Sequence, residues 1–117
     1  MQRTKAPLER IIPIQTTVYR KTVEYFRPRE IAVHLPVVIY GAGFLLIDMT
    51  NRAYVLYERG AREFDVAVIE SDEEFRENFR APARHKTLEG FIRHYEEVWK
   101  PTCQRLGVYR ISDLRIG

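Results

Sequence analysis

The sequence predicts an α+β domain, an antiparallel sheet of four to five strands with two C-terminal helices packed on one face. Two observations predict it. Between residues 30 and 70, short apolar runs alternate with turns that contain Gly or Asn. After Ser71 the apolar residues recur at helical spacing instead. Because 117 residues suit one core, we expect a basic arm or irregular lead-in over 1–13 and a single domain over 14–117.

The expected strands follow one another closely, and short links favour an antiparallel meander. They cover residues 30–40, 44–49, 53–58 and 63–70. Pro36 has no N–H for a sheet ladder, so the strand over 30–40 should lie at an edge or carry a bulge. The run FLLIDM is apolar enough to be buried on both faces. A short hairpin loop around Asn51 should lead into the next strand.

Two further segments carry weaker patterns. Residues 15–26 fit a strand, being rich in β-branched and aromatic residues, and equally a helix, because of the spacing of Tyr19, Val23 and Phe26. Residues 108–116 are expected to form a short closing strand or an ordered tail.

The two helices have clear signals. Ser71 and Glu74 stand at the spacing of a capping box, which predicts a helix over about 72–80 that ends before Pro82. The second helix spans KTLEGFIRHYEEVWK, and Pro101 should end or kink it. Its apolar stripe, at i, i+3, i+4 and i+7, consists of Leu88, Phe91, Ile92, Tyr95, Val98 and Trp99.

The sequence contains no motif for several common chemistries. One cysteine, Cys103, allows neither an intrachain disulfide nor a Cys-rich zinc site. The three histidines lack metal-binding spacing, and no nucleophile motif is present. We therefore expect no metal, no cofactor and no enzyme activity. An enzyme assembled from scattered residues would draw on His34, Asp48 and His94.

Composition also bears on location and partners. No apolar run approaches the ~18 residues of a membrane span, and the N-terminus lacks the apolar segment of a signal peptide. We therefore expect a cytoplasmic protein with no membrane partner. Residues 1–29 hold seven basic and two acidic side chains, whereas residues 30–117 hold twelve basic and fourteen acidic ones. Such asymmetry fits either a polyanion-binding segment or a solvated surface.

Two candidate surfaces result from these patterns. In VYRKTVEYFRPR, basic and aromatic residues interleave as in proteins that pair phosphates with arginines and bases with rings. Its candidate nucleic-acid contacts are Tyr19, Arg20, Lys21, Tyr25, Arg27 and Arg29. The second candidate is a ligand or partner surface. It combines an aromatic wall with two polar residues, His34 and Asp48. Its members are His34, Tyr40, Asp48, Tyr54, Tyr95 and Trp99.

A longer pattern resembles a known family. After Arg29 come a strand, Leu35-Pro36, FLLIDMTNRAYVL, Gly60, DVAVIES and YEEVWKP. This order resembles the end of the phospholipase-D-like sensor domains of TrmB-type prokaryotic transcription regulators. The HxKxxxxD motif of the catalytic phospholipases is absent, because Lys86 directly follows His85 and no Asp matches. The 28 residues before the match are too few for a winged helix, so the resemblance implies a free-standing, non-catalytic sensor or a piece of a longer regulator.

The function expected from these observations is a non-enzymatic regulatory or partner-binding module that self-associates. The expected edge strand and the abundance of aromatic residues motivate it. The alternative is a nucleic-acid-binding protein that uses residues 1–29.

Overall fold

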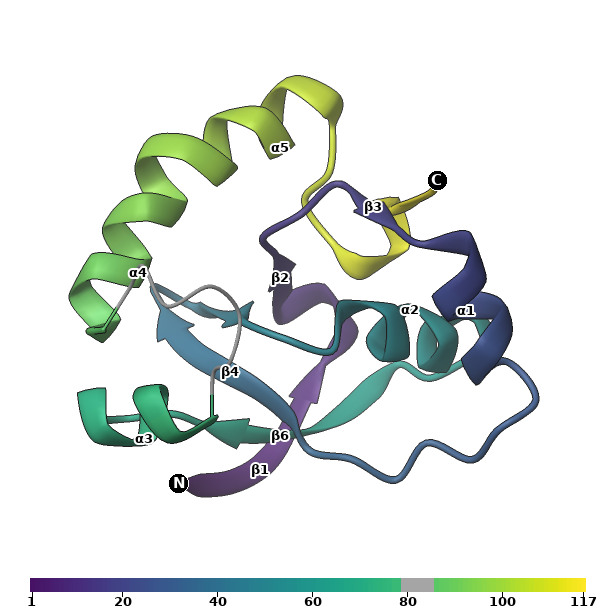
Figure 1. Cartoon of the computed structure of the whole chain (residues 1–117), viewed down its shortest axis with the longest axis horizontal. Helices are drawn as coiled ribbons and strands as arrows, with labels where there is room; N and C mark the ends of the chain where they lie inside the picture. Colours follow the sequence, from purple (N-terminus) through teal and green to yellow (C-terminus); the bar gives the residue numbers. More distant parts are fainter. Residues whose placement is uncertain (79–85) are drawn as a thin grey trace.

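The chain forms a mixed five-stranded sheet with helices on both faces (Figure 1). The computed structural model describes residues 1–78 and 86–117. The sheet order is β1-β6-β4-β5-β2, and a second sheet pairs β3 with β7. The strands are β1 (Gln2–Pro7), β2 (Ile11–Pro13), β3 (Thr17–Val18), β4 (Leu35–Tyr40), β5 (Gly43–Leu46), β6 (Glu63–Val68) and β7 (Arg115–Ile116). The α+β prediction is confirmed, but the sheet is not purely antiparallel.

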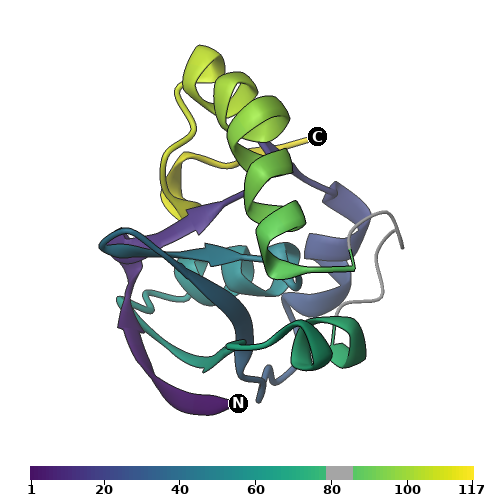
Figure 2. The same cartoon turned by 90° about the vertical axis from the view of Figure 1, so that its left-hand side faces the viewer.

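The helices number more than the two expected. They are α1 (Arg20–Phe26), α2 (Thr50–Glu58), α3 (Asp72–Asn78), α4 (Leu88–His94), a π-helical turn (Tyr95–Trp99) and α5 (Lys100–Leu106), with 3-10 turns at Leu8–Arg10 and Ile111–Asp113. Figure 2 shows α3 and the long helix from α4 to α5 toward the viewer. The predicted end of α3 before Pro82 lies outside the described residues.

The strand β4 is central, with β6 parallel on one side and β5 antiparallel on the other. The prediction that Pro36 places this strand at an edge is therefore wrong. Pro36 is tolerated because the β4–β5 ladder begins only at Val37, so the ladder requires no N–H from Pro36. The strand is also shorter than predicted, because residues 31–34 precede it as a loop.

Residues 53–58, predicted to be a strand, belong to helix α2. The reason is topological. Because β5 and β6 lie on opposite sides of β4, the chain must cross over β4 between them, and a two-residue hairpin cannot do so. Asn51 is accordingly helical, and the left-handed residue before the helix is Met49, with φ 64°.

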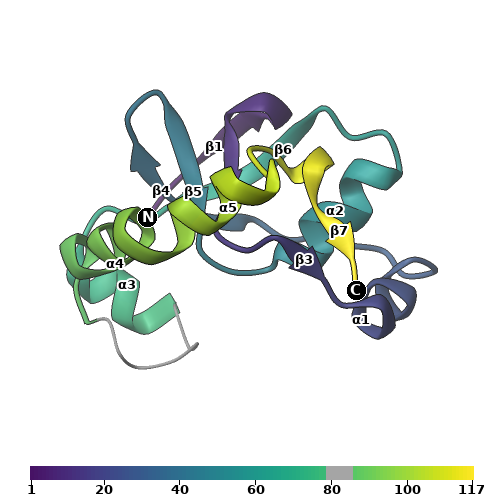
Figure 3. The same cartoon turned by 90° about the horizontal axis from the view of Figure 1, so that it is seen from above.

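The N-terminal residues 1–13 were expected to form an arm or lead-in, but they enter the sheet at both of its edges. β1 pairs antiparallel with β6 along six residues, and β2 pairs parallel with β5. The open alternative over 15–26 resolves into both elements, since β3 precedes α1. The closing strand is reduced to β7, which pairs parallel with β3 beside α1 (Figure 3).

Alternating strand residues build a core on each face of the sheet. Val37, Leu46 and Val66 join the core under α1 and α2, whereas Val38 and Leu45 join the core under α3 and α4. Of the run 44–49, which was predicted to be buried on both faces, Leu45, Leu46 and Ile47 are buried in the two cores, whereas Asp48 is exposed.

The long helix continues through Pro101 because of its π-helical turn. The Lys100 N–H donates to the Tyr95 carbonyl, five residues back, so Pro101 falls in the first turn of α5, where a missing N–H costs little. The wider turn also rotates Val98 off the predicted apolar stripe, and its side chain is 46% exposed.

Substitution of one buried and one exposed sheet residue tests the assignment of the core. Leu46 is fully buried, whereas Ile39 on the neighbouring strand is 58% exposed. We expect Leu46→Ala to lower the free energy of unfolding by about 2–5 kcal/mol and Ile39→Ala to change it by about 0.5 kcal/mol. Urea denaturation followed by circular dichroism measures both, and equal losses would contradict this assignment of the core.

Candidate nucleic-acid interface

The six predicted nucleic-acid contacts lie on and beside one element, the short helix α1. Tyr19 is its N-cap residue, Arg27 its C-cap residue, and Arg29 lies two residues further on. Tyr19 is 66% exposed and Tyr25 is 55% exposed. In residues 15–26 the buried side chains are those of Val18 and Val23. The polar and aromatic side chains of the segment therefore lie on the outer face. The structure thus brings the whole predicted set together.

Arg20 and Lys21 are the free cations of this set. Both are exposed, and within the described part of the chain neither side chain takes part in an ion pair. Such groups keep their full hydration and charge for a partner. Glu24 lies on the same helix, also exposed, and is the one carboxylate of α1.

Arg27 has a different role, because its side chain forms an ion pair with α2. Its guanidinium donates two hydrogen bonds to the Glu58 carboxylate, at 3.1 and 2.8 Å. The hydrogen bond with Glu58 raises the pKa of the Arg27 guanidinium above its ordinary value. A fork-to-fork pair of this kind fixes both side chains, so Arg27 positions α1 rather than offering a free charge.

Arg59, which sequence reasoning missed, holds the C-terminal end of α1. Its terminal amino group donates to the carbonyl oxygens of Phe26 at 2.9 Å and Arg27 at 2.8 Å, and to that of Arg29. Carbonyls at the end of a helix lack i+4 donors within the helix, and that of Phe26 also accepts the Arg29 N–H at 3.0 Å. A cation there also suits the helix dipole.

Arg52 is the second missed residue. Its guanidinium lies over the Phe26 ring, 4.9 Å from the centroid. Arg52 belongs to α2 and Arg59 is its C-cap residue, so a helical interpretation of residues 50–58 would have placed both beside Glu58. Their proximity to α1 had no local signal.

Tyr25 and Arg29 form a stacked pair at the end of α1. The Arg29 guanidinium lies 3.7 Å from the centroid of the Tyr25 ring and donates to the Tyr25 carbonyl. Phe26 meets the same ring edge-on, with centroids 5.1 Å apart. The ring is therefore held in place while more than half of the residue stays exposed.

The second predicted surface is divided between separate parts of the molecule. Tyr40 and Tyr95 pack edge-to-face with centroids 5.3 Å apart. Tyr40 donates to the Glu96 carboxylate at 2.9 Å and accepts from Lys100 at 3.3 Å, which ties β4 to the long helix. Burial raises the pKa of Tyr95 to about 12. This cluster fastens the helix to the sheet.

Trp99 packs in the same core cluster as Tyr40 and Tyr95, whereas Tyr54, Asp48 and His34 lie elsewhere. Trp99 packs against the ring of His94, with centroids 4.4 Å apart, and against Phe91. Tyr54 packs with the opposite core, and burial raises its pKa. Asp48 accepts the Met49 N–H at 2.7 Å and so caps the turn before α2.

His34 lines a depression of about 290 Å³ between the loop before β4, the end of α2 and the start of β6. Glu63 and Asp65 form its acidic side, and Lys5 lies 3.9 and 3.6 Å from their carboxylates. This depression does not suit a phosphate. Within residues 1–78 and 86–117, no group of three acidic, His or Cys side chains is arranged to hold a metal ion, and no helix is long and apolar enough to cross a membrane.

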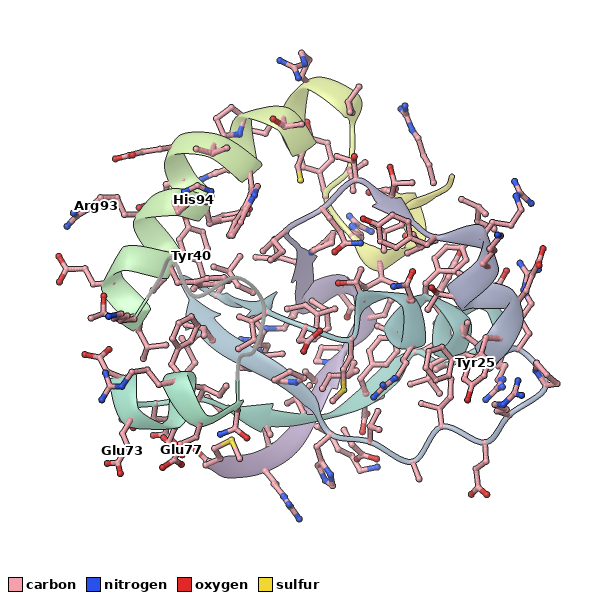
Figure 4. The ribbon with its side chains drawn as sticks, viewed as in Figure 1. Tyr25, Tyr40, Glu73, Glu77, Arg93 and His94 are labelled. Carbon is pink, nitrogen blue, oxygen red and sulfur yellow. The ribbon has the colours of Figure 1, made fainter. Side chains whose placement is uncertain are left out.

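Charge is separated along the molecule. The stretches 19–29 and 50–62, which contain α1 and α2, hold seven basic and two acidic residues. The stretch 63–78, which ends in α3, holds seven acidic residues and one basic. Figure 4 shows Tyr25 at one end of the long axis and Glu73 and Glu77 at the other. We call residues 19–29 and 50–62 the basic end.

Comparison with known proteins finds a similar fold and no matching family. No family model matches the chain, and no curated protein matches it. Among solved structures it is similar to the crystal structure of protein Atu1540 from Agrobacterium tumefaciens, with a TM-score of 0.59 and 18% sequence identity. The match covers 99% of this chain and 62% of that one. A likeness at this identity concerns the fold alone.

The anchoring role of Arg59 can be measured. We expect Arg59→Ala to lower the free energy of unfolding by about 1 kcal/mol and to speed amide exchange at Arg27 and Arg29, because the end of α1 loses its fixed carbonyls. Arg62→Ala is the matched control, since Arg62 donates only to the adjacent Ala61 carbonyl and stacks loosely on Tyr57 at 5.7 Å. Equal exchange in both variants would contradict the anchoring role.

Proposed function

We propose that the protein is a non-enzymatic binding module that contacts nucleic acid through its basic end. One observation carries the proposal: Arg20 and Lys21 are exposed without a carboxylate partner in the described chain, beside the exposed rings of Tyr19 and Tyr25. Cations of this kind gain affinity by releasing counterions from phosphates. Exposed rings offer a face on which bases can stack.

Neighbouring groups favour the same partner. Glu58, the acidic residue of α2, is neutralised by Arg27 at 2.8 Å, so it adds little repulsion. Glu73 and Glu77 of α3 lie at the far end of the molecule from Tyr25. A polyanion approaching this protein would therefore be oriented toward α1 by the field of the whole molecule.

The regulatory role implied by the resemblance to TrmB-type sensor domains, and a cytoplasmic location, belong to the same proposal. A module that binds nucleic acid without catalysis would act by occupying a site or by recruiting a partner. Self-association through an edge strand at 30–40 loses its basis, because β4 is internal.

Titration of labelled oligonucleotides tests the proposal. We expect the intact chain to bind with an affinity that falls steeply with salt, and Arg20→Ala/Lys21→Ala to weaken it about tenfold or more. Removing two phosphate contacts should reduce the slope of log K against log salt by about 1.4 for a single strand. Fluorescence anisotropy at several salt concentrations measures both quantities.

Two controls sharpen the result. Arg93→Ala removes an exposed arginine of α4 that pairs with Glu89 at 3.0 Å, and it should leave binding unchanged. Glu24→Gln removes the one carboxylate of α1 and should strengthen binding. An intact, folded chain that binds no oligonucleotide at low salt would refute the proposal.

Self-association is a second candidate, and the separation of charge favours it. The acidic stretch 63–78 of one copy is complementary to the basic end of another. Sedimentation velocity should then show a dimer or larger species at low salt that dissociates as salt rises. Glu73→Lys/Glu77→Lys should abolish it, whereas Glu89→Lys on α4 should not. A monomer at every salt concentration would exclude this candidate.

A further inference from the structure

We infer that the nucleic acid bound by the basic end is single-stranded, and that its bases stack on Tyr25 and Tyr19. This inference rests on the proposed function and names its substrate class. It follows from the two rings, from the cations next to them and from what engages the backbone at the start of α1.

Tyr25 has the surroundings of a stacking platform. Lys21 precedes it by four residues, so the two side chains share one face of α1. Arg29 covers one face of the ring at 3.7 Å, and Phe26 supports its edge. A base can stack on the exposed part of the ring or on the flat guanidinium, while Lys21 meets the adjoining phosphate.

Tyr19 supplies a second platform at the other end of α1. Its backbone N–H donates to the Asn51 side-chain oxygen at 2.8 Å, so the N-cap position is tied to α2. The two tyrosines lie six residues apart, which is about 9 Å along a helix axis. Arg20 and Lys21 lie between them in the sequence. In the sequence, the two rings thus flank the two cations.

A duplex fits this face less well. Its bases are stacked on one another and inaccessible to side-chain rings unless they are unpaired. A helix that reads the major groove presents its N-terminal residues to the base edges. Here the Arg20 N–H donates to the Gly117 carbonyl at 3.2 Å, and β3 and β7 lie at that end of α1 (Figure 3). The backbone at the start of α1 is therefore engaged by the residue that follows β7, while the side chains of Tyr19, Arg20 and Lys21 stay exposed.

The test compares a single strand with a duplex on the intact chain. The probes are an oligothymidine of about twelve nucleotides and a duplex of equal length, followed by anisotropy at low and at moderate salt. We expect tighter binding of the single strand by about tenfold or more. Tyr19→Leu/Tyr25→Leu should weaken single-strand binding by about ten- to a hundredfold and leave duplex binding nearly unchanged.

Matched variants separate stacking from other effects. Tyr19→Phe/Tyr25→Phe keeps both rings and should bind within about threefold of the intact chain, because stacking needs no hydroxyl. Tyr109→Leu removes another exposed tyrosine, 56% exposed and outside α1, and should have no effect. Thermal unfolding of each variant verifies that it folds.

The outcomes distinguish the two proposals. Equal affinity for both probes, together with unchanged binding by the Leu variant, would overturn the stacking inference while leaving phosphate contact by the basic end intact. No binding of either probe by the intact chain would overturn both.

Discussion

The central position of β4 is the constraint on which the rest of the structure depends. Because β5 and β6 flank it on opposite sides, the chain between them has to pass from one side of β4 to the other, and α2 lies in this connection. α2 in turn supplies Glu58 and Arg59, which fix the end of α1. The basic, aromatic face of α1 is thus held in place by a helix that exists because of the strand order.

The arginines of the basic end divide into two physical roles. Arg27 donates hydrogen bonds to a carboxylate and Arg59 to backbone carbonyls. These contacts fix the end of α1. Arg20 and Lys21 remain hydrated and unpaired within the described chain. Cations held on a rigid helix lose less conformational entropy on binding than cations on a flexible arm. In this respect the α1 face differs from the disordered basic tails of many polyanion-binding proteins.

Local patterns were enough to predict the parts of the fold that depend on local physics. β6 and the cap of α3 by Ser71 and Glu74 follow from alternation and spacing alone. α2 escaped prediction because residues 53–58, AYVLYE, are rich in the aromatic and β-branched residues that favour strands. Only the distant order of strands decides between the two forms. The basic face was predictable because it is contiguous in sequence.

The π-helical turn lets one continuous helix serve two cores. Phe91, before the turn, and Tyr95, its first residue, are buried in the core that α3 covers. After the turn, Cys103 is buried with the core that α1 and α2 cover. The change of helical phase over residues 95–99 turns the buried stripe from one layer to the other. A helix shared in this way contacts both cores, so we expect the opening of one layer to disturb the packing of the other.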